Sequence, residues 1–259
     1  MPEEQWQEYR RPPHRQEYAK PVTSDVDIEP TEEELGNISA ACNRLWGLDL
    51  NRLSPGRDYE IECGEGKRVG DQQDRADNAF FSYVNEDVFR RPTFARFYAL
   101  LDNYSAKQGV REHVSEEEKQ EENAFIEEIS RTAPIQYLFR YLVAQRVVSD
   151  NQAEFKEHLH SLWFGLYGRA GAHDSSSAFE HVFVGEVKRG EFEDEISGFH
   201  NWIKVFFFYL GALCFKGDRL IIGIGNGSAQ ALSFLNQFEL GLGLLKPVKA
   251  KPVTKLVKA

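Results

Sequence analysis

The sequence has few cysteines. Only Cys42, Cys63 and Cys214 occur in 259 residues, an odd number at wide spacing. Disulfide-stabilised secreted domains and structural zinc sites use closely spaced cysteines. The composition therefore excludes a disulfide framework and a cysteine zinc site, and we expect reduced thiols.

Long apolar runs are also lacking. The longest, residues 205–215, is shorter than the roughly 20 residues that a membrane-spanning helix needs. Residues 1–6 lack the basic and apolar segments of a secretory signal. We therefore expect no membrane span and an intracellular protein, and secretion would require an additional N-terminal segment.

Basic residues are outnumbered by acidic ones, 31 against 41, which gives a net charge of −10. Nonspecific binding to nucleic acid relies on clustered Lys and Arg, so this balance disfavours it. The charge is distributed unevenly, because residues 112–128 hold eight glutamates and residues 246–259 hold five lysines and no acid. We interpret the glutamate run as a solvated helix face.

The chain is long enough to bury a hydrophobic core and divides by pattern into three parts. Residues 1–30 mix Pro, Gln, Glu and Arg without apolar periodicity, which predicts a disordered extension. Residues 31–168 show mainly helical spacing, whereas residues 169–259 are predicted to be β-rich. The sequence therefore predicts an α+β fold, with a helical N-terminal half before a β-rich half.

Two helix starts are marked by a serine or threonine followed three residues later by a glutamate. These are Thr31 with Glu34, and Ser115 with Glu118. The first of these helices is expected to bury one face, formed by Leu35, Ile38, Cys42 and Leu45. Further helices are predicted over residues 78–88, 93–104, 135–143 and 155–167.

Two histidines, His181 and His200, lie in apolar and aromatic stretches of the second half. A lone histidine on an apolar strand is usually a hydrogen-bonded core residue. Two imidazoles, however, are what RNA cleavage by internal transesterification needs. One accepts the proton of a ribose 2′-OH and the other protonates the leaving 5′-oxygen, and their ordinary pKa of about 6.5 suits both steps.

The segment 178–187 around His181 is rich in Val and Phe, which predicts a strand. On a regular strand Glu180 and Glu186 lie on the opposite face from His181, unless a bulge intervenes. We interpret the two glutamates either as supports that orient the site or its loops, or as ordinary strand carboxylates.

The histidine segments resemble the catalytic half of the EndoU family of uridylate-specific endoribonucleases. The resemblance rests on WFGLY at 163–167, DSSSAFEHVFVGE at 174–186 and GFHNW at 198–202. Four upstream segments resemble the helical half of the same family, in the same order. They are CNRLW at 42–46, DLNRL at 49–53, RPTF at 91–94 and LLDNY at 100–104. The resemblance covers about residues 32–203.

This resemblance implies cleavage of single-stranded RNA at uridylates, leaving 2′,3′-cyclic phosphate and 5′-OH ends. It assigns His200 as the general base and His181 as the general acid. A lysine that stabilises the phosphorane is expected from a Gly-x-x-Lys-Pro-Val segment, which Lys246 matches. Many animal members are stimulated by manganese, so Mn²⁺ is an expected ion. We expect no organic cofactor and a monomer.

Beyond residue 203 the sequence departs from the family, and the strands expected to contact uracil have no counterpart. The competing hypothesis is therefore a catalytically impaired isoform that acts as an RNA-binding or protein-interaction module. Cleavage of a uridine-containing oligonucleotide separates the two.

Other motifs are weaker. A glycine pattern at Gly223, Gly225 and Gly227 lacks the Lys-Ser/Thr partner of a phosphate loop. His158 and His160 are two residues apart and do not share a helix face, which disfavours a metal site with His173. Asp174 and the serines at 175–177 lack the glycines of a nucleophile elbow, so a polar loop is the favoured interpretation.

Overall fold

The computed structural model describes residues 15–20, 26–62, 80–105, 107–188, 195–198, 200–204 and 206. The chain separates into two compact units. The first contains residues 1–59 and 83–199, and the second contains residues 60–82 and 200–259.

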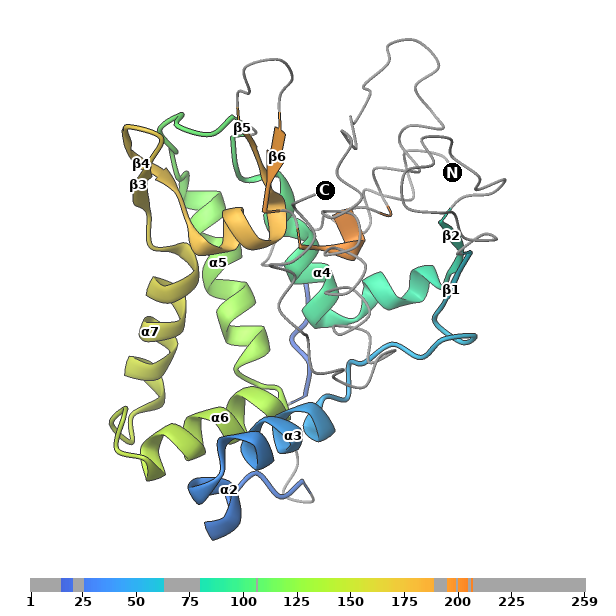
Figure 1. The fold of residues 1–259 in the computed structure, drawn as a ribbon, viewed down its shortest axis with the longest axis vertical. Helices are drawn as coiled ribbons and strands as arrows, with labels where there is room; N and C mark the ends of the chain where they lie inside the picture. The colour runs from blue at the N-terminus through green and yellow to red at the C-terminus, as the bar shows by residue number, and fades with distance from the viewer. Residues whose placement is uncertain are drawn as a thin grey trace, which may run out of the picture. The chain divides into compact units, whose positions relative to one another are not determined.

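Helices precede most of the short strands along the described chain (Figure 1). The helices are α2 (Glu32–Gly36), α3 (Ile38–Leu48), α4 (Pro92–Ala99), α5 (Glu116–Ile129), α6 (Ala133–Ala144) and α7 (Gln152–Phe164), with 3₁₀ turns η2 (Glu86–Arg90) and η3 (Leu100–Asp102) and a π-helical turn η4 (Glu180–Val184). The strands are β1 (Tyr59–Ile61), β2 (Phe81–Val84), β3 (Tyr167–Arg169), β4 (Ala172–Ser176), β5 (Glu186–Lys188) and β6 (Glu195–Ser197). They pair in sequence order, β1 with β2, β3 with β4 and β5 with β6. The predicted α+β class is confirmed.

Both predicted capping boxes are present. The Thr31 hydroxyl accepts the N–H of Glu34, whose carboxylate accepts the N–H of Thr31. Ser115 and Glu118 make the same reciprocal pair at the start of α5. Each box satisfies two backbone N–H groups that the first helical turn leaves without partners.

The first predicted helix is broken in two at Asn37. The Asn37 side-chain oxygen accepts the N–H groups of the next turn and starts α3 afresh. As a result Ile38 is 71% exposed and Cys42 is exposed, so the predicted apolar face is wrong at both positions. Ala41 and Leu48 are the buried residues of α3 instead.

The helix predicted over residues 78–88 is wrong. Its described part forms strand β2 and the beginning of the 3₁₀ turn η2. Asn85 separates them, since its side chain accepts the N–H of Asp87 and its own N–H donates to Asp58. Aromatic and β-branched residues at Phe81, Tyr83 and Val84 suit a strand better than a helix.

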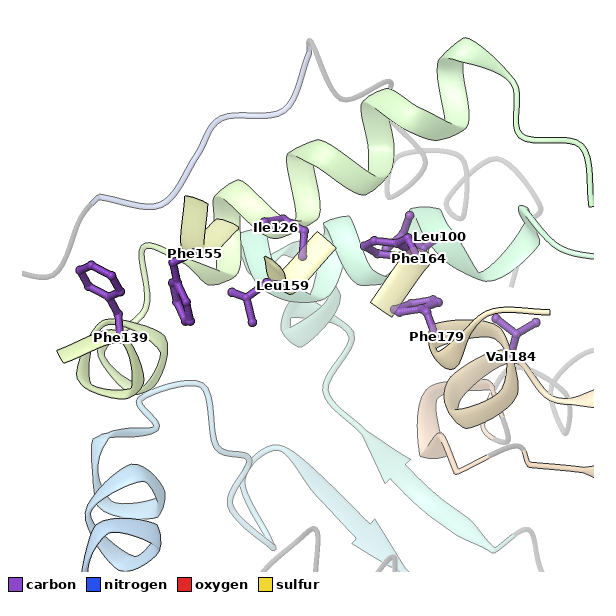
Figure 2. Close-up of a cluster of buried hydrophobic side chains, with 8 residues drawn as sticks. All are labelled: Leu100, Ile126, Phe139, Phe155, Leu159, Phe164, Phe179 and Val184. Carbon is purple, nitrogen blue, oxygen red and sulfur yellow. The ribbon is translucent and has the colours of Figure 1, made fainter. Parts of the chain in front are cut away.

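The core of the first unit gathers side chains from α4 to η4. Its buried members are Leu100, Ile126, Phe139, Phe155, Leu159, Phe164, Phe179 and Val184 (Figure 2). The ring of Phe179 lies 5.5 Å from that of Phe97 and 5.2 Å from that of Phe164, centroid to centroid. Burying one such side chain contributes about 1.5–3 kcal/mol. Because Phe179 and Val184 flank the turn that carries His181, the core fixes that turn.

Residues 15–20, which sequence analysis assigned to a disordered extension, contact α4 and α5. The Ala19 N–H donates to both carboxylate oxygens of Glu128, at 3.2 and 3.3 Å. Arg96 donates to the Gln16 carbonyl and lies under the Tyr18 ring, 4.1 Å from its centroid. Arg96 and Glu128 form a buried ion pair at 3.5 Å.

In the second unit the described residues include an aromatic contact group. The Phe81 ring lies 6.0 Å from Trp202 and 5.6 Å from Phe206, centroid to centroid. Within the described ranges, no helix has both the length and the apolar character to cross a membrane.

Candidate functional site

His181 is carried by a helical turn rather than by the predicted strand. The N–H of His181 donates to the Ser177 carbonyl, and the N–H of Gly185 donates to the Glu180 carbonyl five residues earlier. The Ser177 hydroxyl accepts the N–H of Glu180. The apolar residues that suggested a strand fit this π-helical turn instead. Phe179 and Val184, which are five residues apart, are both buried. The predicted strand over residues 178–187 is therefore wrong up to Gly185, and β5 begins at Glu186.

Two charged side chains meet the Nδ1 atom of His181. The Oε2 atom of Glu186 lies 3.1 Å from Nδ1, and an Nη1 nitrogen of Arg169 lies 2.6 Å from it. The same guanidinium nitrogen is 2.9 Å from Glu186 Oε2. Glu186 is fully buried, Arg169 is partly buried, and the His181 side chain is 31% exposed. The imidazole is thus held at Nδ1 by partly or fully buried side chains, while part of the ring remains exposed to solvent.

The β3–β4 hairpin places Arg169 beside the imidazole. Its connecting residues, Ala170 and Gly171, both have positive φ angles, 51° and 86°. Such a pair is typical of the tightest hairpin turn, whose twist matches that of the strands. The buried Ser175 hydroxyl accepts the N–H of Arg169 at 2.9 Å and lies 3.0 Å from its carbonyl oxygen. The backbone of Arg169 is therefore fixed on both sides.

The β5–β6 hairpin brings Gly198 against the backbone of His181. Its register pairs Glu186 with Ser197, so the following residue reaches the turn. Gly198 has φ of +80°, and a Cβ there would collide with the His181 carbonyl oxygen and lie 3.2 Å from Nδ1. Glycine is required by both the conformation and the close approach.

Glu180 was predicted as a second support, but it does not contact the imidazole of His181. It is buried, and neither carboxylate oxygen has a hydrogen-bond partner among the described residues. Burial, together with the nearby carboxylates Glu112 and Glu186, raises the pKa of Glu180 to about 8. The side chain is therefore mainly a neutral carboxylic acid at pH 7.

Replacing Glu180 with glutamine is expected to change how stability depends on pH. The folded-state pKa, about 8, lies above the ordinary value of 4.5, so the folded protein binds the extra proton between these values. The free energy of unfolding of the wild type then falls as pH rises from 4.5 to 8, by at most about 1.4 kcal/mol per unit. Glutamine stays neutral, so the free energy of unfolding of Glu180→Gln should rise relative to that of the wild type as the pH increases from 4.5 to 8.

Urea unfolding between pH 5 and 9 measures this difference. Glu157→Gln, at an exposed position of α7, is the control and should follow the wild type. Parallel curves for wild type and Glu180→Gln would contradict the assignment of a buried neutral carboxyl.

The other two predicted catalytic residues are not placed relative to His181. His200 is an exposed residue of the second unit, next to the buried Asn201, whose side-chain oxygen accepts the N–H of Ile203. Lys246 lies outside the described residues. That His181, His200 and Lys246 share one groove therefore stays a prediction.

Where the structure describes the residues of the weaker motifs, several of them make structural hydrogen bonds or ion pairs. The 175–177 serines are buried; Ser175 binds the Arg169 backbone and Ser177 caps the His181 turn. His160 lies 3.1 Å from Glu122, and His173 is exposed. The glycine pattern at 223–227 lies outside the described residues.

No group of three or more His, Cys, Asp or Glu side chains converges as metal ligands would in the part of the chain that the structure describes. These residues do not fit a protein-held Mn²⁺ site, which normally uses several converging oxygen or nitrogen ligands.

Residues 37–209 match the family described as Endoribonuclease XendoU. The chain belongs to this family. The EndoU resemblance drawn from the motifs is thereby confirmed over nearly the same range.

Two relatives of this XendoU-family chain illustrate the similarity. It is 39% identical over 186 residues to Uridylate-specific endoribonuclease B of Danio rerio, covering 70% of this chain and 65% of that protein. It is 41% identical over 181 residues to Poly(U)-specific endoribonuclease-B of Xenopus laevis, covering 67% and 60%. The chain therefore spans less than two thirds of the length of these relatives.

A solved structure agrees with this assignment. It is described as XendoU, a splicing-independent snoRNA-processing endoribonuclease, and it is 37% identical to this chain. The two superpose with a TM-score of 0.57, over 71% of this chain and 64% of that one.

Three side chains at the His181 site of this XendoU-family chain were missed in the sequence. They are Arg169 and the two residues that contact its guanidinium, Ser197 and Gln108. Arg169 carries a faint signal, because it is a basic residue next to the small and polar stretch before His181. Gln108 and Ser197 carry none, since their roles depend on pairings between distant segments.

Proposed function

We propose that this chain is an endoribonuclease that cleaves single-stranded RNA at uridylates. The observation that supports this most directly is the His181 arrangement, a partly exposed imidazole backed by a buried carboxylate, in a chain of the XendoU family. The Glu186 carboxylate, 3.1 Å from Nδ1, is placed to accept a hydrogen from that nitrogen when the imidazole acts as a general acid.

The proposed reaction is an internal transesterification. His200 takes the proton of the ribose 2′-OH, and the 2′-oxygen attacks the adjacent phosphorus. The bond from phosphorus to the 5′-oxygen breaks, and His181 gives its proton to that oxygen. The products are a 2′,3′-cyclic phosphate and a 5′-OH end, and the proposed role of Lys246 is to stabilise the extra negative charge of the phosphorane.

Manganese is given no step in this scheme. The described residues do not form a site for it, so we propose that any stimulation by Mn²⁺ reflects RNA binding or folding. We further propose that the protein acts as a monomer inside the cell.

Replacing the one uridine of a short single-stranded RNA with 2′-deoxyuridine is expected to abolish cleavage at that position. The deoxyribose has no 2′-oxygen to attack the phosphorus. The measurement is the cleavage rate of a fluorogenic oligonucleotide, and the control replaces a distant non-uridine nucleotide with its deoxy form. Equal cleavage of the two would exclude the mechanism, and no cleavage of the all-ribose substrate would favour the impaired RNA-binding or protein-interaction alternative.

A further inference from the structure

Arg169 is held by contacts that use all of its hydrogen-bond donors. A guanidinium has five N–H bonds in one plane. With its amide oxygen turned towards the guanidinium, Gln108 accepts from Nε at 2.5 Å and from Nη2 at 3.2 Å. The Ser197 hydroxyl lies 3.2 Å from Nη2, and Nη1 reaches both His181 and Glu186. No donor remains for a phosphate, so Arg169 acts on the protein itself.

The three atoms Arg169 Nη1, Glu186 Oε2 and His181 Nδ1 form a triangle with sides of 2.6, 2.9 and 3.1 Å. If Nδ1 has a lone pair, the two hydrogens on Nη1 satisfy both Nδ1 and Oε2. If Nδ1 carries a hydrogen, that hydrogen faces the guanidinium N–H at 2.6 Å, which is unfavourable. The triangle therefore fits an unprotonated Nδ1, with the cationic guanidinium bridging two acceptors, Nδ1 and Oε2, that lie 3.1 Å apart.

We propose that Arg169 is a positioning residue that keeps Nδ1 of His181 unprotonated, so that the neutral imidazole carries its hydrogen on Nε2. Gln108 and Ser197 hold the guanidinium in place for this task. Nε2 makes no hydrogen bond with any described residue, and the side chain is partly exposed, which leaves this nitrogen for a ligand. The consequence for catalysis rests on the proposed function, whereas the tautomer is a property of the free protein.

Charged side chains surround Nδ1 of His181, and they determine which contacts must change when that nitrogen gains a hydrogen. Arg169 approaches from β3 and Glu186 from β5, while Glu180 on the same turn and Glu112 from the segment before α5 interact electrostatically with each other. An imidazolium needs a hydrogen on Nδ1, and Glu186 is placed to accept it. Arg169 must then give up its contact with Nδ1.

The first test reads the tautomer directly. In the full chain labelled with ¹⁵N-histidine, the His181 signals are assigned by comparison with His181→Ala. At a pH where the ring is neutral, the nitrogen shifts should show hydrogen on Nε2 in the wild type. Arg169→Met keeps the length and removes the donors, so the hydrogen should move to Nδ1, facing Glu186. Gln108→Leu, which frees the guanidinium, should give a mixture.

Arg111→Met is the matched control, because Arg111 is an exposed arginine paired with Asp174 and should leave the His181 tautomer unchanged. A wild-type ring with hydrogen on Nδ1, or a folded Arg169→Met with an unchanged ring, would overturn the proposal. If Arg169→Met does not fold, the wild type and Gln108→Leu still decide the question.

The second test uses the dependence of cleavage on pH. Without a guanidinium beside Nδ1, the rate profile of Arg169→Met should differ in shape from that of the wild type. A loss of affinity for an uncleavable deoxyuridine RNA, with tautomer and profile unchanged, would instead make Arg169 an RNA ligand. A wild type that cleaves no RNA defeats the proposed function and leaves the tautomer result standing.

Discussion

Replacing His181 with alanine is expected to slow cleavage of a uridine-containing oligonucleotide by about 10²–10⁴-fold. This is the usual contribution of a positioned general acid or base, and His200→Ala should lose a similar factor. The measurement is the single-turnover rate at saturating protein, which separates chemistry from RNA binding.

His158→Ala is the control for these two variants. His158 is an exposed histidine of α7 and belongs to the same unit as His181, so its removal should leave the rate unchanged. Circular dichroism establishes that each variant is folded. An undiminished rate in either His181→Ala or His200→Ala would remove that residue from the mechanism.

Replacing Glu128 with alanine is expected to lower the free energy of unfolding by about 3–5 kcal/mol. The change leaves Arg96, which is buried, without its anionic partner, and it removes the acceptor of the Ala19 N–H. Burial raises the pKa of Glu128 although that N–H and Arg96 both lower it, which shows how strongly this carboxylate is desolvated. The effect of the variant is thus the penalty of an unpaired buried charge.

Glu127→Ala provides the comparison within the same helix. Glu127 pairs with Lys156 at 2.6 Å and Arg131 at 2.8 Å, but its side chain is 31% exposed and the arginine has a similar exposure. Partly solvated pairs contribute about 0–1 kcal/mol. Urea unfolding followed by circular dichroism measures both variants, and equal losses would contradict the role assigned to burial at Glu128.

Local signals in the sequence predicted local structure well. The capping boxes at Thr31 and Ser115 were found because both partners lie within one turn of each other. Asn37 was missed because its preference for a cap competes with an apolar spacing that continues across it. In the same way, Phe179, Val182 and Val184 suggested a strand, since a short apolar run has no period of its own.

The candidate site was only partly predictable for a related reason. His181 and Glu186 were found from a motif that lies within one short segment. The guanidinium of Arg169 reaches them through a hairpin, and Gln108 reaches Arg169 through a hydrogen bond between its own N–H and the Val187 carbonyl of β5. Such contacts between distant segments depend on tertiary packing, which no spacing rule encodes.

The contact between Gly198 and the His181 carbonyl has a consequence for motion. Where two backbones touch without an intervening side chain, one cannot shift by a fraction of an ångström without displacing the other. The β5–β6 hairpin and the backbone of His181 should therefore fluctuate together on the picosecond-to-nanosecond timescale, with similar backbone order parameters. Side-chain rotation in the ring is then the main freedom left to His181, and the contacts at Nδ1 restrict that as well.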